Sequence, residues 1–353
     1  MTTTKKQIFV KIFLLSLVIL LSGCNLNTNN KIPDGGIWKS TDGGRSWQQA
    51  SDILATKGKI LGLNSVSINK IIFDPQDNKT LYLATEGNGV FYSLDGANSW
   101  QSFSQLPKTT FNDIAVDPKN KCVIYVVSGN KLFKTDNCGR DFFNIYYHQK
   151  DQILLTAIAV DFYNSQIVYL GTSEGEILKS TNGGRSWQTS YRVGSTILDI
   201  LFDPSDSRIV YVGTQRNGLF KTVNAGGNWS ELNTGINSYS GGNEYRRLLI
   251  DPASPEGLIF VSKSAIIRST DRGVSWKSIE LLPSKKVLVI TAAGVNPQNS
   301  QELYYTTEST LVKTLDGGNT WSSVKLPYNN YITSFFAISR DGLIYLATKK
   351  VKK

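Results

Sequence analysis

The chain has 353 residues, of which 40% are hydrophobic and 19% are charged, and its formal net charge at pH 7 is +10. This basic excess is mild and spread along the chain, so it lacks the dense basic patch that marks a nucleic-acid-binding protein. The single His, His148, argues against a metal centre or a hydrolytic triad, and we expect no metal and no cofactor.

The first 23 residues have the pattern of an export signal. A basic start is followed by an apolar core over residues 12–21, which is too short to span a membrane comfortably. The sequence Leu-Ser-Gly that precedes Cys24 resembles a bacterial lipoprotein signal in which Cys24 carries the lipid. A plain secretory signal or an uncleaved anchor is the alternative. We expect a signal peptide over residues 1–23 and a polar tether over residues 24–34.

An eight-residue phrase, Ser-Thr-Asp-Gly-Gly-Arg-Ser-Trp at residues 40–47, is the first of seven related copies. The others begin at residues 93, 135, 180, 222, 269 and 314, and such a period indicates a repeat architecture. The hydroxyl, the Asp or Asn and the Gly predict a tight turn, and the aromatic residue begins the next strand and supplies apolar surface. The residues expected to carry this structural role are Asp42, Trp47, Asp95, Trp100, Asn137, Asn182, Trp187, Asn224, Trp229, Asp271, Trp276, Asp316 and Trp321.

A second phrase recurs between these turns. It is an apolar strand that ends in Asp-Pro or a related turn, followed by another apolar strand, as in residues 68–75 and 80–87. Proline cannot donate to a strand ladder, and an Asp before it favours a turn. We therefore interpret the recurring acidic residues as turn residues and not as catalytic acids. They are Asp74, Asp117, Asp161, Asp203 and Asp251.

The repeating unit therefore has four strands, and the two ends of the chain each supply part of one unit. Residues 35–49 provide a third and an outer strand, whereas residues 331–349 provide an inner and a second strand. Only a closed ring joins these halves into one sheet. We predict an all-β fold over residues 35–349, a seven-bladed β-propeller of four-stranded antiparallel blades. Residues 343–347 should pair with residues 37–40, residues 350–353 form a basic tail, and no helix follows the signal peptide.

Two cysteines lie symmetrically about one predicted hairpin. Cys122 and Cys138 have their midpoint at Asn130, close to the hairpin tip, so the two side chains could face each other across the strands. In an exported protein this arrangement favours a disulfide over two buried thiols.

The seven turn phrases resemble the Asp-box, also called the bacterial neuraminidase repeat, over residues 35–349. The same box occurs in sialidases, xyloglucanases, sortilin-type receptors and photosystem II assembly factors, where it lies at the blade edge and is structural. A lipoprotein with one seven-box ring is most similar in layout to the photosystem II stability and assembly factors. That resemblance implies a non-catalytic propeller that binds a newly made membrane protein.

The enzymes that share the box differ from this sequence at important positions. Sialidases resemble one another in an Arg-Ile-Pro near the start of the domain, where this chain has Lys31-Ile32-Pro33. Xyloglucanases use two Asp residues that face each other across a cleft between two propellers, and this chain has a single ring. These departures favour a binding protein over an enzyme.

One face of a propeller carries the outer-to-inner loops and the second-to-third hairpins, and here those loops vary most. They combine Tyr and Arg, which suit protein recognition. The candidate binding residues are Tyr191, Arg192, Arg216, Tyr239, Tyr245, Arg246 and Arg247. Of the neighbours Arg246 and Arg247, we expect at least one to point toward the channel mouth.

These observations together predict a lipid-anchored, non-enzymatic binding propeller on the extracytoplasmic side of a membrane. Its expected partner is a protein or peptide, such as a membrane protein under assembly, and the propeller itself should be a monomer that binds no nucleic acid. A glycan-directed protein of the sialidase or xyloglucanase kind is the alternative. Acidic pairs about 5–9 Å apart in a pocket on the loop-bearing face would favour that alternative.

Overall fold

The computed structural model describes residues 34–53, 61–239, 241–282 and 288–351. The expected signal peptide, the lipidated Cys24, the tether up to residue 33 and the last two Lys lie outside these residues. The segment Asp34–Lys353 is one compact unit, and its described part is almost entirely β-structure.

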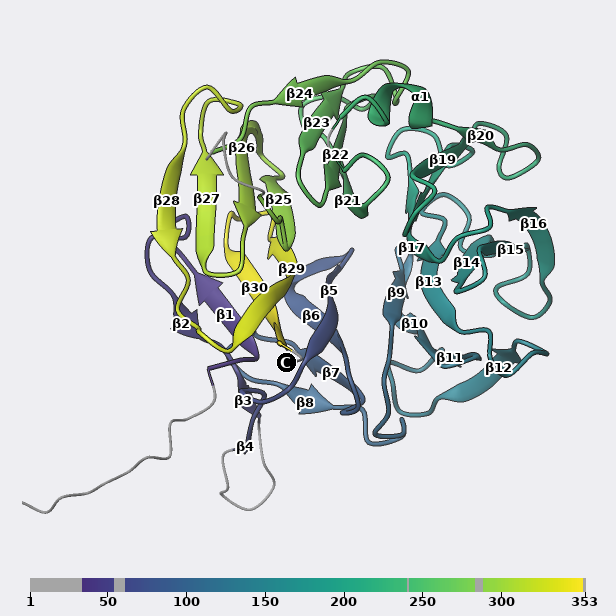
Figure 1. Cartoon of the computed structure of the whole chain (residues 1–353). Coiled ribbons are helices and arrows are strands. Elements are labelled where there is room, and N and C mark those ends of the chain that lie inside the picture. Colours follow the sequence, from purple (N-terminus) through teal and green to yellow (C-terminus); the bar gives the residue numbers. More distant parts are fainter. Residues whose placement is uncertain (1–33, 54–60, 240, 283–287, 352–353) are drawn as a thin grey trace, which may run out of the picture. The chain divides into compact units, whose positions relative to one another are not determined.

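Seven four-stranded antiparallel sheets form the blades of a β-propeller, as predicted (Figure 1). Blade 1 consists of β5 (Ile68–Asp74), β6 (Asp77–Thr85), β7 (Val90–Ser93) and β8 (Gln101–Ser102). Blade 2 consists of β9 (Asp113–Asp117), β10 (Asn120–Ser128), β11 (Lys131–Thr135) and β12 (Phe143–Tyr147). Blade 3 consists of β13 (Leu155–Val160), β14 (Val168–Thr172), β15 (Glu176–Ser180) and β16 (Gln188–Arg192). In each blade the first strand given is the innermost one.

The remaining blades follow the same order from the inside to the outside. Blade 4 consists of β17 (Ile197–Phe202), β18 (Val210–Thr214), β19 (Leu219–Thr222) and β20 (Ser230–Glu231). Blade 5 consists of β21 (Tyr245–Ile250), β22 (Leu258–Ser262), β23 (Ile266–Ser269) and β24 (Lys277–Ile279). Blade 6 consists of β25 (Ala292–Asn296), β26 (Asn299–Thr306), β27 (Thr310–Thr314) and β28 (Ser322–Lys325).

Blade 7 closes the ring with strands from both ends of the chain. It consists of β29 (Tyr331–Ile338), β30 (Ile344–Lys350), β1 (Ile37–Ser40) and β2 (Gln48–Gln49). The antiparallel register of β1 and β30 runs from Ile37 opposite Ala347 to Ser40 opposite Ile344, which confirms the predicted closure. Neighbouring innermost strands contact one another all the way round, so the ring has no open seam.

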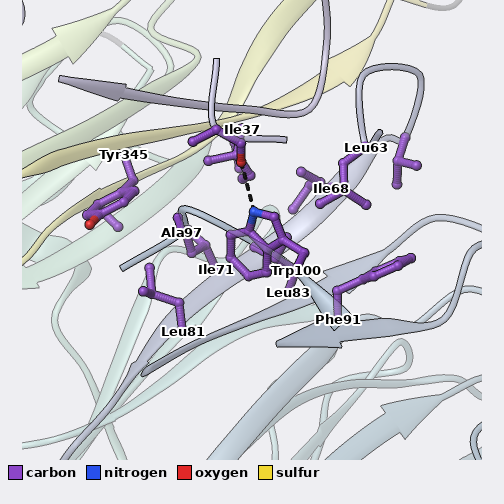
Figure 2. Packing of buried hydrophobic residues seen from close by; sticks show 14 residues of the cluster. Ile37, Leu63, Ile68, Ile71, Leu81, Leu83, Phe91, Ala97, Trp100 and Tyr345 are labelled. Atoms are coloured by element: carbon purple, nitrogen blue, oxygen red, sulfur yellow. Dashed lines mark hydrogen bonds between the residues drawn. The ribbon is translucent and has the colours of Figure 1, made fainter. Parts of the chain in front are cut away.

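Hydrophobic clusters between neighbouring blades form the core, and each contains one of the seven box aromatic residues. Trp100 is fully buried among Ile37, Ile68 and Leu83, which come from blades 7 and 1 (Figure 2). The other box aromatic residues are half-buried, and the strand after each box begins one residue later than expected. Each box therefore also joins two blades through its aromatic side chain.

The complete burial of Trp100 has a local cause. The segment that follows β2 folds back over the indole ring of Trp100. Trp100 donates from Nε1 to the carbonyl of Ala50 and from its backbone N to the carbonyl of Asp52. The same segment forms an additional two-stranded sheet from β3 (Asp52–Ile53) and β4 (Leu61–Gly62). This sheet lies outside the four-stranded repeat.

One element contradicts the expectation that no helix follows the signal peptide. The short helix α1 (Asn233–Ile236) lies in the loop between blades 4 and 5. Ile236 is fully buried, and Tyr239, just after the helix, donates its hydroxyl to the carbonyl of Trp276. The loop folds into a helical turn because it packs over this Trp, a contact that no local sequence pattern announces.

Candidate functional site

The seven box turns share one hydrogen-bond scheme. In the box of blade 7, Ser40 donates its hydroxyl to Asp42 and accepts from the backbone N of Gly44, both at 2.8 Å. Asp42 Oδ1 also accepts from the backbone N of Ser46 at 2.9 Å. The fourth and fifth box residues have positive φ in all seven copies, including four that are not Gly: Ala97, Cys138, Ala225 and Arg272. The box is therefore a structural turn, with its first hydroxyl buried in every blade.

Both Asp and Asn form this turn, with different hydrogen bonds to the seventh residue. Where the third residue is Asp, its second oxygen accepts the hydroxyl of the seventh residue, as between Ser275 and Asp271. Where it is Asn, the amide donates instead, as from Asn182 to Ser186 at 2.8 Å. Burial alone would raise the pKa of Asp271, but the hydrogen bonds from Ser275 and Ser269 outweigh it and lower that pKa to about 2.

The acidic residues that end the inner strands also act as turn residues. The side chains of Asp74, Asp117, Asp161, Asp203 and Asp251 each accept from the backbone N two residues further on, at 2.6–3.0 Å. All five are buried. Asp203 also pairs with Arg272 of the next blade's box at 2.9 Å, so that turn links two blades. This geometry agrees with the structural interpretation made from the sequence.

The two cysteines of blade 2 are joined in a disulfide in the structure. Cys122 lies in β10, and Cys138 is the fourth residue of the box. The backbone N of Cys138 donates to the carbonyl of Cys122 at 3.1 Å. The equivalent backbone bond is present in blades 1, 3, 4, 5 and 6, for example from Gly96 to Lys79. The disulfide therefore adds a covalent link at a position where the fold already holds the two backbones together.

Three of the candidate binding arginines lie on the surface of the loop face, by which we mean the side with the outer-to-inner loops and the second-to-third hairpins. The side chain of Arg192 is 68% exposed, and Arg216 and Arg246 are also exposed. Tyr191, next to Arg192, is 39% exposed. The backbone N of Arg216 donates to Ser195 at 3.0 Å, so the hairpin of Arg216 lies against the loop that follows Arg192.

Glu176 partly compensates the charge of Arg192 and connects it to the only His. Arg192 Nε and Nη2 lie 2.9 and 2.8 Å from Glu176 Oε1, and His148 Nε2 lies 3.0 Å from Glu176 Oε2. His148 follows β12 in blade 2, whereas Glu176 begins β15 in blade 3. His148 therefore links two blades through Glu176, and only 11% of its side chain is exposed.

The other candidate binding residues are buried or half-buried and contact other parts of the fold, and this corrects the predicted patch. Tyr245 is 1% exposed and donates its hydroxyl to Asp199 at 3.0 Å. Tyr239 is half-buried over Trp276. Arg247 turns into the channel, where its Cζ lies 3.9 Å from the centre of the Phe335 ring. A β-bulge at Arg246 explains the change, because the extra residue interrupts the alternation of side chains in β21.

A network of charged side chains crosses the channel. Lys70 on β5 contacts Asp113 on β9 at 3.3 Å and Asp199 on β17 at 2.9 Å. Burial would lower the pKa of Lys70, but the two carboxylates outweigh it and hold that pKa above its usual value. Asp113 also accepts from the backbone N of Ile158 on β13 at 3.2 Å. These contacts connect four of the seven inner strands.

Arg247 and Tyr245 extend the network to the other three inner strands. Both residues lie on β21, and the Tyr245 hydroxyl joins Asp199. Arg247 Nη1 donates to the carbonyls of Ala293 on β25 and Phe336 on β29. All seven inner strands therefore take part in one set of buried polar contacts, which fixes their mutual positions across the channel.

The sequence contains a signal for this network that the repeat pattern conceals. Lys70, Asp113, Asp199 and Arg247 each lie four residues before the Asp that ends their own inner strand. The same position holds Ala157, Ala292 and Phe335 in the other blades. Four charged residues at a fixed position of otherwise apolar strands could have predicted a charged layer in the channel. Their pairing required knowledge of which strands face each other.

The carboxylates of Asp113 and Asp199 are not free in the way that a glycosidase requires. Such an enzyme needs two carboxylates that are open to the sugar and to a water or an anomeric carbon. Here both carboxylates contact the same Lys70 ammonium group, and Asp113 also accepts from two backbone N–H groups.

Within the described residues, no group of three or more His, Cys, Asp or Glu could hold a metal ion. No described helix is long and apolar enough to cross a membrane.

Two family models match separate parts of the chain. Residues 35–152 match the model described as sortilin, neurotensin receptor 3, and residues 190–324 match the model described as photosynthesis system II assembly factor YCF48. Among curated proteins, a xyloglucanase from Paenibacillus sp is 25% identical over 179 residues, which are 48% of this chain and 14% of that protein.

Solved structures show the same fold at low sequence identity. A GH74 xyloglucanase from Xanthomonas campestris has a TM-score of 0.65 and 16% identity, over 81% of this chain and 51% of its own. YCF48 bound to D1 peptide has a TM-score of 0.60 and 16% identity, over 82% of this chain and 93% of its own. This chain thus spans about half of the first of these structures and almost all of the second. It is similar to both kinds of protein in fold.

Proposed function

We propose that this chain is a non-catalytic, lipid-anchored propeller that binds a protein or peptide partner outside the cytoplasm through its loop face. The observation that carries the proposal is the group of exposed Arg192, Arg216 and Arg246, with Tyr191, on adjoining blades of that face. Arg pairs with carboxylates through two parallel hydrogen bonds and stacks on aromatic rings, so the surface suits an acidic or extended segment. A similar propeller, YCF48, has been solved bound to D1 peptide.

The place where the propeller begins also supports binding of the partner through the loop face. Strand β1 is the third strand of its blade and therefore begins at the loop face, where Asp34 accepts from the backbone N of Asn329 at 3.0 Å. The ten residues that follow Cys24, residues 25–34, span at most about 35 Å. A lipid on Cys24 would then keep the loop face within that distance of the membrane, which suits a partner that is itself in the membrane.

The test is a triple substitution of Arg192, Arg216 and Arg246 by Glu in the tagged, full-length lipoprotein. We expect capture of the partner from its native membrane to be lost while the thermal unfolding transition is retained, because all three side chains are exposed. The matched control replaces Arg45, Arg140 and Arg185 by Glu, since these exposed residues share one box position on the opposite face. Unchanged capture by the first variant, or equal loss in both, would show that the binding surface lies elsewhere.

A glycan-directed function is the second candidate, because the curated match is to a xyloglucanase. It predicts that xyloglucan oligosaccharides bind the purified protein or are cleaved by it. Calorimetry and reducing-end release assays would show this directly. Binding that survives the Arg192, Arg216 and Arg246 triple substitution would place the glycan away from the loop-face arginines.

A further inference from the structure

A cavity of about 420 Å³ lies in the channel, beside the charged network. Residues of β5, β17, β21, β25 and β29 line it. The lining runs from the layer of Lys70, Asp199, Arg247 and Phe335 to the last residues of the same strands, such as Ile250. Because inner strands run from the loop face toward the Asp-Pro turns, the charged layer is one end of the cavity and the rest extends toward the turn side.

Apolar side chains make up about half of the surface of this cavity, beside the polar groups at its end. They include Ile72, Leu201, Leu249, Val295 and Ile338, all of which are only partly buried. Large side chains that stay partly exposed around a closed ring form an apolar chamber with a polar end. The volume falls within the range of 300–1,000 Å³ that small-molecule sites occupy, and such sites combine apolar walls with a few polar groups that fix orientation.

The positive charges of Lys70 and Arg247, at the polar end of the cavity, differ in whether a carboxylate lies close enough to balance them. Lys70 is matched by Asp113 and Asp199, which both contact its ammonium group. Asp199 also accepts from Tyr245, so its oxygens are engaged. Arg247 has no carboxylate within ion-pair distance among the described residues, and it donates from Nη1 to two carbonyl oxygens only. Its Nε and Nη2 hydrogens have no protein acceptor in the described part of the chain.

We propose that this cavity binds a small apolar molecule that ends in a carboxylate, such as a medium-chain aliphatic monocarboxylate. The carboxylate accepts from Arg247, whose planar guanidinium lies over Phe335 and is held in place by the carbonyls of β25 and β29. The apolar chain extends between Leu201, Leu249 and Val295. A partly buried guanidinium gains a charged partner in this way. The site is separate from the loop-face arginines and does not depend on their function.

The test measures binding of octanoate, octanol and octylamine to the full-length protein by isothermal titration calorimetry. We expect octanoate to bind more tightly than either of the other two. Arg247→Gln should weaken octanoate binding at least tenfold and leave octanol unaffected. The matched control Arg246→Gln, which changes the exposed neighbour, should leave octanoate binding unchanged. Equal binding of octanoate and octanol, no octanoate binding at millimolar concentration, or an equal effect of the two Arg variants would overturn the proposal.

A second variant decides the matter if Arg247→Gln fails to fold. Val295→Phe keeps Arg247 and fills part of the apolar chamber, so octanoate binding should fall at least tenfold with the unfolding transition preserved. Undiminished octanoate binding by a folded Val295→Phe protein would show that octanoate binds elsewhere, and the assignment of the cavity would be wrong.

Discussion

At the scale of single residues, the box shows that one turn can be built with either a carboxylate or an amide. Asp42, Asp95, Asp271 and Asp316 accept the hydroxyl of the seventh residue, whereas Asn182 donates to it. The hydrogen bonds that fix the turn lower the pKa of each of these four carboxyl groups. The Asp boxes therefore contribute a pH-dependent stability that the Asn boxes lack.

The sign of this effect gives a testable pH dependence. Asp271 has a pKa near 2 in the folded protein, below its unfolded value of about 3.9. Its contribution to stability is present above pH 4 and is lost as the pH falls toward 2. Asp271→Asn should therefore lose less stability than the parent between pH 7 and pH 3. We expect a difference of about 2 °C in Tm, because exposed charge interactions are weak.

The reciprocal change is the control for this experiment. Asn182→Asp converts an Asn box into an Asp box and should increase the acid sensitivity of the thermal transition by a similar amount. Parallel pH profiles for all three proteins, measured by circular dichroism, would contradict the role given to the box carboxylates.

At the scale of elements, the recurrent backbone bond between the fourth box residue and the second strand explains where the cysteines lie. Cys138 occupies a position with a φ of 60°, which non-Gly residues rarely adopt, and its backbone N already reaches Cys122. The same backbone hydrogen bond is present in blades 1, 3, 4, 5 and 6, where no Cys occupies this position. The disulfide should add to the stability of blade 2 and should not determine its fold.

We predict that the oxidised protein has no free thiol when Cys24 is replaced by Ala. The measurement is thiol counting in denaturant without reductant, and two free thiols would end the assignment.

Replacing both Cys122 and Cys138 by Ser should lower the free energy of unfolding by about 3 kcal/mol, as closure of a loop of this length suggests. The double variant should keep the β-sheet circular dichroism spectrum of the parent.

At the scale of the whole molecule, the ring depends on strands from both ends of the chain. Blade 7 joins β1 and β2 to β29 and β30, and β29 contacts the inner strands of both neighbouring blades. The channel network depends on the same closure, because Arg247 donates to the carbonyl of Phe336 on β29. Loss of the last two strands would therefore affect blades 6 and 1 as well as blade 7.

Deletion of residues 331–353 should abolish cooperative unfolding of the entire propeller. The truncated ring would leave β1 without its partner β30 and would expose the apolar faces of blades 6 and 1, and an unpaired strand edge favours aggregation. Removal of residues 352–353 alone is the control and should leave Tm unchanged. A chain without residues 331–353 that melts in one transition at the parent's Tm would show that ring closure is not required.

The repeat, the turns and the number of blades could all be predicted from the sequence. A box needs only a hydroxyl, an Asp or Asn and two residues that tolerate positive φ, all within eight positions, so its structure is local. The Asp-Pro turns are equally local. The ring closure also followed from the sequence, because the chain starts and ends with complementary halves of one four-stranded unit.

The side chains that meet inside the ring could not be predicted from the sequence. Lys70 and Asp199 are 129 residues apart, and their contact exists because the ring brings β5 and β17 to the same channel. The register shift at Arg246 leaves Tyr245 buried between blades 4 and 5 and Arg247 in the channel, so neither contributes to the predicted surface patch. Period-two alternation cannot anticipate an extra residue in a strand, and no local pattern states which blades face each other. The loop-face arginines and the channel site therefore became separate surfaces only when the strands were placed in the closed ring.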